Sequence, residues 1–256
     1  MLLEVAGIRK SYESQKGSFD ALDDVTLNVG AGEIVGLIGT SGSGKSTLAS
    51  VVAGLETADA GTVAFDGVCS DATIPLRKRS GAFRKAAAGL QMVFQHPASS
   101  FSDRMRIGKG VAEGVAYRGI PKGEQLERAL AALEHVGLPR AYADKYPWEL
   151  SGGECQRAAI ARAIVGSPKL IVCDEPTSAL DVTVQAQVVN LLARLCSERG
   201  MACLFISHDL ALVRGLCSRA YVIDAGAVVE DGPVERLFDA PGADATKRLV
   251  ASVVAI

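Results

Sequence analysis

The sequence has 256 residues, 48% of them hydrophobic and 22% charged, and its formal net charge is -2. A chain of this length and composition buries a hydrophobic core, which excludes a disordered protein. A net charge this small excludes the basic field on which sequence-independent nucleic-acid binding depends, so nucleic acid is not expected as a partner.

The sequence shows no segment that would export the chain or span a membrane. The first residues, Met1–Val5, lack a basic stretch followed by a long apolar run. No apolar run reaches the roughly 18 residues of a spanning helix. We therefore expect a cytoplasmic protein that meets a membrane only through a partner. The six cysteines form no C-x-x-C pair and are expected to be small, buried hydrophobic side chains.

The first third of the chain predicts strands. Leu3–Val5 and Val25–Val29 alternate as half-exposed strands do, and Glu33–Ile38 is a nearly continuous apolar run that predicts a buried strand.

A glycine-rich run follows this buried strand directly and matches the pattern G-x-x-x-x-G-K-[ST]. We call it the phosphate loop, and its residues are Gly39, Thr40, Ser41, Gly42, Ser43, Gly44, Lys45, Ser46 and Thr47. Its glycines let the backbone turn N–H groups inward at the start of a helix expected over Lys45–Ala53, which predicts binding of ATP phosphates. Lys45 is expected on the β- and γ-phosphates, and the Ser46 hydroxyl on Mg²⁺.

From about Met105 to Val165 the pattern becomes helical. One buried face is predicted for Leu126, Leu130, Leu133 and Val136.

A second anion site is predicted near the end of this helical stretch. Ser151 is expected to cap a helix that continues to Ile164, while Gly152 and Gly153 expose N–H groups at the positive end of the helix dipole.

Two carboxylates follow the next buried strand, Leu170–Cys173. The carboxyl edge of a parallel sheet is where α/β proteins bind ligands. Asp174 is expected to hold Mg²⁺, and Glu175 to polarise the water that attacks the γ-phosphate.

The last third predicts a helix with Val184, Val188, Leu191, Leu192 and Leu195 on one side, and then a strand at Ala202–Ile206. Strand, helix and strand in this order imply a parallel sheet, and so an α/β fold. A hairpin over Ala220–Glu230 and a short terminal helix from about Pro241 complete the chain.

A five-residue segment resembles the signature motif of ABC ATPases. We call it the signature turn, and it consists of Leu150, Ser151, Gly152, Gly153 and Glu154, about twenty residues before the acidic strand. The resemblance covers essentially the whole chain and implies a P-loop ATPase with a mixed core sheet, an antiparallel β subdomain and a helical insertion. It implies a single domain, with residues 1–95 and 166–256 as the core and about 96–165 as the helical subdomain.

The resemblance also implies roles for residues outside these two motifs. Gln95 would reach Mg²⁺ and the attacking water, His208 would sense the γ-phosphate, and Tyr12 would stack on adenine. The loop that crosses between subunits would consist of Ser178, Ala179, Leu180 and Asp181.

In ABC ATPases each nucleotide lies between the phosphate loop of one subunit and the signature turn of the other, so this chain is expected to work with a second ATPase subunit. The stretch from Gln91 to Phe101, together with the signature turn, is similar to the peptide and nickel uptake branch, although His96 and Asp103 depart from its pattern. That branch implies a paralogous ATPase partner, two permeases, an extracytoplasmic solute-binding protein and a place on the cytoplasmic face of the cell membrane. An exporter ATPase and a cluster-assembly ATPase are the alternatives.

Overall fold

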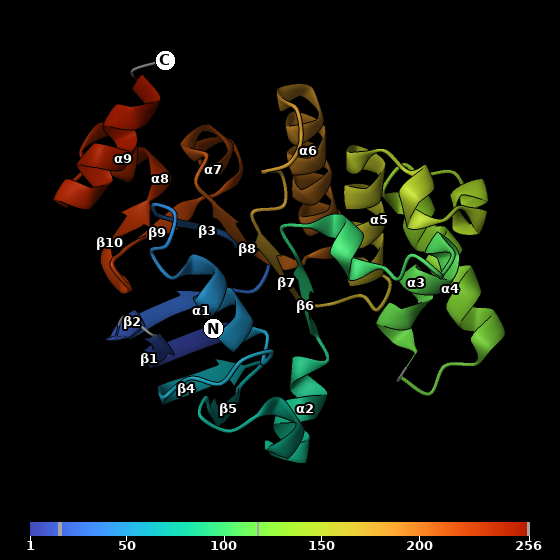
Figure 1. Ribbon diagram of the computed structural model, residues 1–256, viewed down its shortest axis with the longest axis horizontal. Coiled ribbons are helices and arrows are strands. Elements are labelled where there is room, and N and C mark those ends of the chain that lie inside the picture. Colours follow the sequence, from blue (N-terminus) through green and yellow to red (C-terminus); the bar gives the residue numbers. More distant parts are fainter. Residues whose placement is uncertain (15–16, 117, 255–256) are drawn as a thin grey trace.

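The computed structural model describes residues 1–14, 17–116 and 118–254. Two sheets lie beside a helical region (Figure 1). The strands are β1 (Leu3–Ser14), β2 (Gly17–Val29), β3 (Ile34–Ile38), β4 (Ala60–Phe65), β5 (Val68–Asp71), β6 (Leu90–Val93), β7 (Leu170–Asp174), β8 (Ala202–Ser207), β9 (Arg219–Asp224) and β10 (Ala227–Pro233). The α-helices are α1 (Lys45–Val52), α2 (Gly81–Ala87), α3 (Ile107–Ala112), α4 (Lys122–His135), α5 (Gly152–Ile164), α6 (Val182–Arg199), α7 (Leu210–Leu216), α8 (Val234–Asp239) and α9 (Asp244–Val254). Short 3-10 turns cover Leu76–Lys78, Pro97–Ser100, Glu113–Val115, Arg140–Asp144 and Pro147–Glu149.

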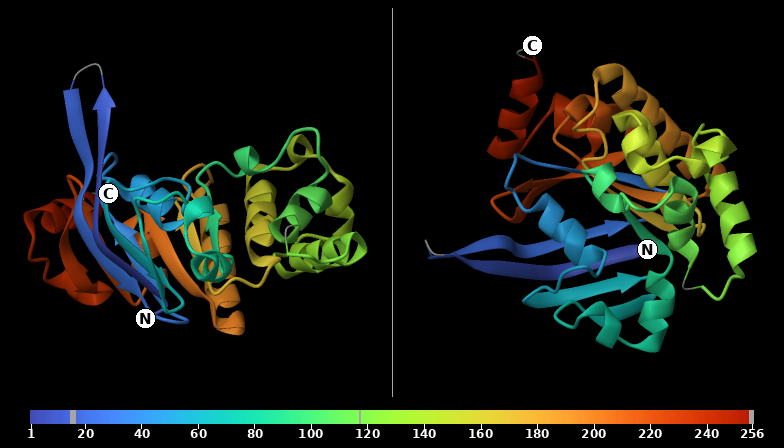
Figure 2. Two further views of the ribbon diagram at one scale, coloured as in Figure 1. Left: turned by 90° about the horizontal axis from the view of Figure 1, so that it is seen from below. Right: turned by 45° about the vertical axis from the view of Figure 1, so that its right-hand side comes forward.

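The smaller sheet is antiparallel, with the strand order β2-β1-β4-β5. Its first two strands are much longer than predicted, because β1 continues to Ser14 and β2 begins at Gly17. They form a hairpin that projects past the rest of the sheet (Figure 2). The outer part of β2 is exposed, so it carries no alternation of apolar and polar residues from which its length could be predicted.

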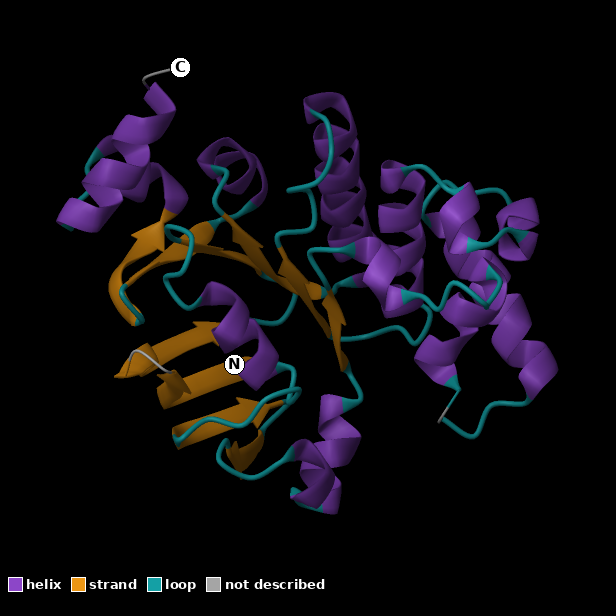
Figure 3. Cartoon of the chain, in the orientation of Figure 1, coloured by secondary structure: helices purple, strands orange, loops and turns teal. Residues whose placement is uncertain are grey.

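The larger sheet has the order β10-β9-β3-β8-β7-β6, and all its pairs are parallel except the β9–β10 hairpin. This confirms the mixed sheet. Successive residues of β7 alternate between two hydrophobic cores: Ile171 and Cys173 face the core shared with the helices, whereas Leu170 and Val172 face the core shared with α1 and the smaller sheet. The first four residues of the strand are therefore all apolar, because both of its faces are covered (Figure 3).

The helical region lies between β6 and β7, where α4 packs on α3 and α5. The predicted buried face of α4 is wrong at Leu126, which is 45% exposed. Leu126 lines an open hollow with Arg106 and Lys109, whereas the helix contacts are made by the smaller Ala129 and by Leu133. Small residues allow the helices to approach closely, and the spacing of leucines alone could not reveal that.

One cysteine also departs from expectation. Cys69 is exposed, because the two-residue alternation of the edge strand β5 turns it outward, while the other five cysteines are buried. In the part of the chain that the structure describes, no helix is both long and apolar enough to cross a membrane.

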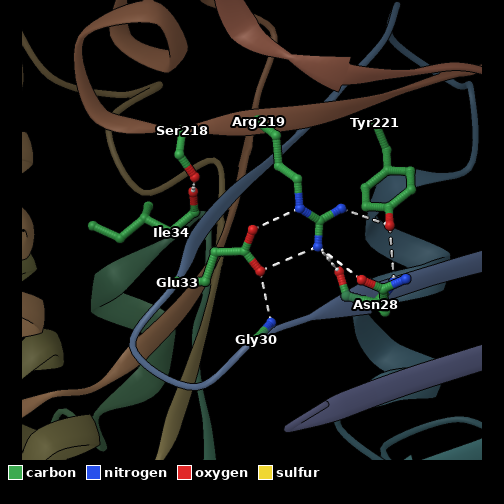
Figure 4. Close-up of polar contacts among 7 residues, drawn as sticks. All are labelled: Asn28, Gly30, Glu33, Ile34, Ser218, Arg219 and Tyr221. Atoms are coloured by element: carbon green, nitrogen blue, oxygen red, sulfur yellow. Dashed lines mark hydrogen bonds and ion pairs between the residues drawn. The ribbon is translucent and has the colours of Figure 1, made fainter.

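A charged network joins the two sheets at the end of β3 that lies away from the phosphate loop (Figure 4). Arg219 of β9 donates to Glu33 Oε1 at 2.6 Å and Oε2 at 3.1 Å, and also to Asn28 O and to the Tyr221 hydroxyl, each at 2.7 Å. Glu33 also accepts from Gly30 N at 2.7 Å. Burial alone would raise the pKa of Glu33, but the hydrogen bonds from Arg219 and Gly30 hold that pKa below its usual value.

Replacing Arg219 with alanine should lower the free energy of unfolding by about 2–3 kcal/mol, because it leaves the partly buried Glu33 carboxylate without its cation. Chemical denaturation measures this loss. Arg128→Ala is the matched control, since Arg128 pairs with Glu124 on an exposed helix face and should cost at most about 0.5 kcal/mol. Equal losses for both variants would show that the network does not hold the sheets together.

Candidate functional site

The phosphate loop connects β3 to α1 with two left-handed glycines, Gly42 at φ 79° and Gly44 at φ 104°. A Cβ on Gly44 would lie 2.3 Å from the carbonyl oxygen of Ala21 in β2, so only glycine fits there. The loop is thus closely packed against the smaller sheet at the point where α1 begins.

Lys45 lies at the centre of this loop and is only 5% exposed. Its Nζ donates to Gly39 O at 3.0 Å and to Thr40 O at 2.7 Å. Burial lowers the pKa of Lys45, and the nearby Glu175 and Asp174 oppose that change. The phosphate loop therefore surrounds the buried ammonium group of Lys45, and two nearby carboxylates stabilise its positive charge.

Ser46 and Asp174 meet although 128 residues separate them in sequence. The Ser46 hydroxyl donates to Asp174 Oδ1 at 3.1 Å. Asp174 is 6% exposed, and burial raises its pKa, with the Ser46 hydrogen bond acting in the opposite direction. A hydroxyl and a carboxylate side by side are oxygen ligands of the kind that Mg²⁺ prefers.

Two side chains contact the Glu175 carboxylate, one at each oxygen. Gln95 Nε2 donates to its Oε2 at 3.2 Å, and His208 Nδ1 lies 3.2 Å from its Oε1. Its backbone has a φ of 44°, which is rare for a residue other than glycine, and its N–H donates to Ile206 O at 3.0 Å. Such strained backbone conformations are common at active sites, although they also occur in turns. The ends of β6, β7 and β8 thus bring these three side chains together.

Tyr12 lies near the outer end of β1. Its hydroxyl donates to Glu56 Oε1 at 2.6 Å and also interacts with Thr47 of α1, while its ring stacks on Phe19 with centroids 5.6 Å apart. Sequence reasoning missed Glu56 and Phe19. The pairing of Tyr12 with Phe19 across the hairpin becomes visible only when the strand register is known.

The signature turn begins α5. Ser151 Oγ accepts from Glu154 N at 3.4 Å, and Glu154 Oε2 accepts from Ser151 N at 2.8 Å, which is a reciprocal capping box. The N–H groups of Gly152 and Gly153 make no hydrogen bond within the described chain. They are free donors at the start of a helix, which suits an anion.

The signature turn and the phosphate loop do not meet within one chain. No hydrogen bond or ion pair joins them among residues 1–14, 17–116 and 118–254, and α5 and α1 lie apart in Figure 1. The loop of Ser178, Ala179, Leu180 and Asp181 runs between Glu175 and α5: the Ser178 hydroxyl donates to Glu175 O at 3.2 Å, and a Cβ on Gly152 would lie 3.4 Å from Leu180.

A groove of about 1200 Å³ separates the core from the helical region. Its lining combines apolar side chains with several charges, and includes Leu76, Arg77, Arg84, Met92, Phe94, Glu113, Ala159 and Arg162. Phe94, which directly precedes Gln95, is 37% exposed. Sequence reasoning did not identify this groove, because residues from many separate segments between Ala53 and Ala163 build it.

The family model described as ABC transporter matches residues 22–178. A protein of Brucella ovis named as a peptide import ATP-binding protein is 43% identical over 98% of this chain and 78% of its own length. The oligopeptide transport ATP-binding protein OppF of Escherichia coli is 39% identical over 99% of this chain and 78% of its own length.

Solved structures of ATP-binding cassettes share the fold. A dimeric cassette in a post-hydrolysis state with ADP and Pi has a TM-score of 0.78 and 29% identity, covering 91% of this chain and 98% of its own. The cbiO1 protein of Clostridium perfringens, part of an ABC transporter complex, has a TM-score of 0.77 and 26% identity, covering 99% of this chain and 94% of its own.

Proposed function

This chain belongs to the ABC transporter family and is an ATPase, and on that premise we propose that it drives the uptake of a small solute, most specifically a peptide, through partner permeases. The observation that carries ATP hydrolysis is the cluster of Lys45, Asp174 and Glu175 at the phosphate loop. A second candidate anion site lies apart from this cluster, at the signature turn that begins α5. The names of the relatives favour peptides over nickel as the cargo.

The phosphate loop would hold the triphosphate of ATP through its N–H groups and Lys45. Mg²⁺ fits the oxygen ligands Ser46 and Asp174, and bound there it would neutralise phosphate charge. No group of three or more His, Cys, Asp or Glu side chains gathers as a metal site among the described residues. The two oxygens of Ser46 and Asp174 do not complete the six ligands that Mg²⁺ takes, so substrate phosphates and water would supply the others.

Hydrolysis forms a bond between the oxygen of a water and the γ-phosphorus, and breaks the bond to the oxygen that leaves on ADP. Glu175 would accept a hydrogen bond from that water and then accept its proton as general base, and the proton is released to solvent when phosphate leaves. Gln95 and His208 hold the two oxygens of Glu175, so they fix the direction in which it presents its charge. Tyr12 would supply an aromatic face for adenine.

We propose that a second ATPase subunit completes the site with its own signature turn. The separation of the phosphate loop from the signature turn within one chain supports this arrangement, because two free N–H groups at a helix start are useful to a phosphate only if they can reach one. ATP would then close the dimer and hydrolysis would reopen it. A paralogous chain is the partner that we favour.

The groove is the surface that we propose for a permease. Apolar side chains and the cations Arg77, Arg84 and Arg162, opposed only by Glu113 in the lining, suit a partner helix that is apolar and acidic. The groove also contains Phe94, so a partner there would act on the segment that carries Gln95. In the proposed arrangement the chain would lie at the cytoplasmic face of the membrane, held by its permeases and served by an extracytoplasmic solute-binding protein.

The proposal is tested by expressing the chain with candidate permeases, purifying the complex and measuring ATP hydrolysis. Arg84→Glu should lower both permease co-purification and solute-stimulated hydrolysis at least tenfold, because it reverses a charge in the groove, whereas Arg128→Glu on the exposed face of α4 should change neither. Stimulation by peptides would support peptide import. Hydrolysis that no permease and no solute stimulates would contradict transport.

A further inference from the structure

The signature turn of this chain carries a negative charge of its own, that of Glu154. The pKa of Glu154 is lowered to about 2, first by the hydrogen bond from Tyr142 and then by those from Ser151. The carboxylate therefore stays charged at any physiological pH. It accepts from the Ser151 N–H and the Ser151 hydroxyl at the start of the same helix, where the γ-phosphate of the neighbouring subunit's ATP is proposed to bind. The Glu154 carboxylate and the γ-phosphate would thus compete for the N-terminus of α5.

The competition centres on the Ser151 hydroxyl. This hydroxyl donates to Glu154 Oε2 at 2.9 Å, so it has to leave Glu154 before it can donate to a phosphate. The same carboxylate oxygen keeps a second donor, the Ser151 N–H at 2.8 Å. The other oxygen, Oε1, accepts from the Tyr142 hydroxyl at 2.6 Å.

Tyr142 lies twelve residues before Glu154, in the 3-10 turn Arg140–Asp144. Its ring is half-buried and packs against the helical core, with Lys145 Nζ 3.8 Å from the ring centroid. A ring fixed in this way holds its hydroxyl in one place. Tyr142 and the signature turn also line one small hollow of about 270 Å³, into which a released carboxylate could move.

We propose that Tyr142 is a positioning residue for the signature turn. By donating to Oε1 it keeps the Glu154 carboxylate satisfied and turned back from the exposed glycines, so that the Ser151 hydroxyl can be given up to the incoming γ-phosphate. Without this donor the carboxylate retains the hydroxyl and moves toward the Gly152 and Gly153 N–H groups. The inference rests on the proposed function, since it needs a nucleotide that approaches this turn from a second subunit.

The test is a double-mutant cycle on the assembled ATPase, with the KM for ATP and kcat measured separately. Tyr142→Phe keeps the packed ring and removes only the hydroxyl. It should raise the KM for ATP about tenfold and lower kcat by less than threefold, with an unchanged melting temperature. In the Glu154→Gln background the same change should shift KM by less than twofold, because a neutral amide does not compete with the phosphate. Tyr146→Phe, which removes a nearby hydroxyl that donates nothing to Glu154, is the matched control.

Two outcomes overturn the inference. One is an unchanged KM in Tyr142→Phe. The other is that Tyr142→Phe raises KM equally in the wild-type and in the Glu154→Gln background. That result would mean that Tyr142 acts only through packing. Ser151→Ala separates the inference from its premise: if Ser151→Ala raises KM and Tyr142→Phe does not, only the role of Tyr142 fails. If neither variant changes KM, the signature turn does not meet ATP and the two-subunit site fails as well.

Discussion

ATP hydrolysis should fall by about 10²–10⁴-fold when Glu175 is replaced with glutamine, while ATP still binds. Glutamine keeps the size of the side chain and can still accept from Gln95, which donates to Glu175 at 3.2 Å. Its neutral amide cannot accept a proton from the attacking water. The variant also lacks one negative charge close to the γ-phosphate, so the nucleotide-bound, closed dimer should accumulate.

Turnover of the purified complex and size-exclusion chromatography with ATP measure these two effects. Glu124→Gln is the matched control, because Glu124 pairs with Arg128 on an exposed helix face and should leave turnover within twofold of the wild type. Wild-type turnover by the Glu175→Gln variant would show that Glu175 has no role in hydrolysis. A variant that no longer binds ATP would show instead that Glu175 supports the phosphate loop.

Local sequence patterns predicted the parts of the site that lie on one continuous segment. The phosphate loop follows a buried strand and begins a helix, and Asp174 ends the buried strand β7 with Glu175 directly after it, as the apolar runs indicated. These patterns are readable because buried parallel strands have to be apolar on both faces. The order of strand, helix and strand then predicted the parallel sheet.

Contacts between distant segments could not be predicted in this way. Gln95 was assigned to Mg²⁺ and water through the resemblance, and its hydrogen bond to Glu175, 80 residues away, was not predicted. The hydrogen bond from Tyr142 to Glu154 depends on how a 3-10 turn packs on α5, and no residue pattern encodes that packing. The length of the β1–β2 hairpin was underestimated for a related reason, since its exposed strands are held by pairing with each other and not by burial.

Replacing Lys45 with alanine is expected to weaken ATP binding at least 100-fold. The ammonium would form charge-assisted hydrogen bonds with the β- and γ-phosphates, each worth about 1.5–3 kcal/mol, and the loss of two such bonds corresponds to about two to four orders of magnitude in affinity. The substitution also removes the cation that offsets Asp174 and Glu175, so the triphosphate would meet two carboxylates without compensation.

Titration calorimetry with ATP measures the affinity, and thermal unfolding shows whether the variant is folded. Lys45 donates to Gly39 O and Thr40 O, and the neighbouring residues Thr40 to Gly42 are exposed, so water can enter the space that the side chain leaves and replace the ammonium. The thermal stability of the variant should therefore change little, while its affinity for ATP falls at least 100-fold. Lys85→Ala, at an exposed position of α2, provides the control. An unchanged affinity in a folded Lys45→Ala variant would mean that the phosphate loop does not bind the triphosphate, because no charged donor other than Lys45 lies within that loop.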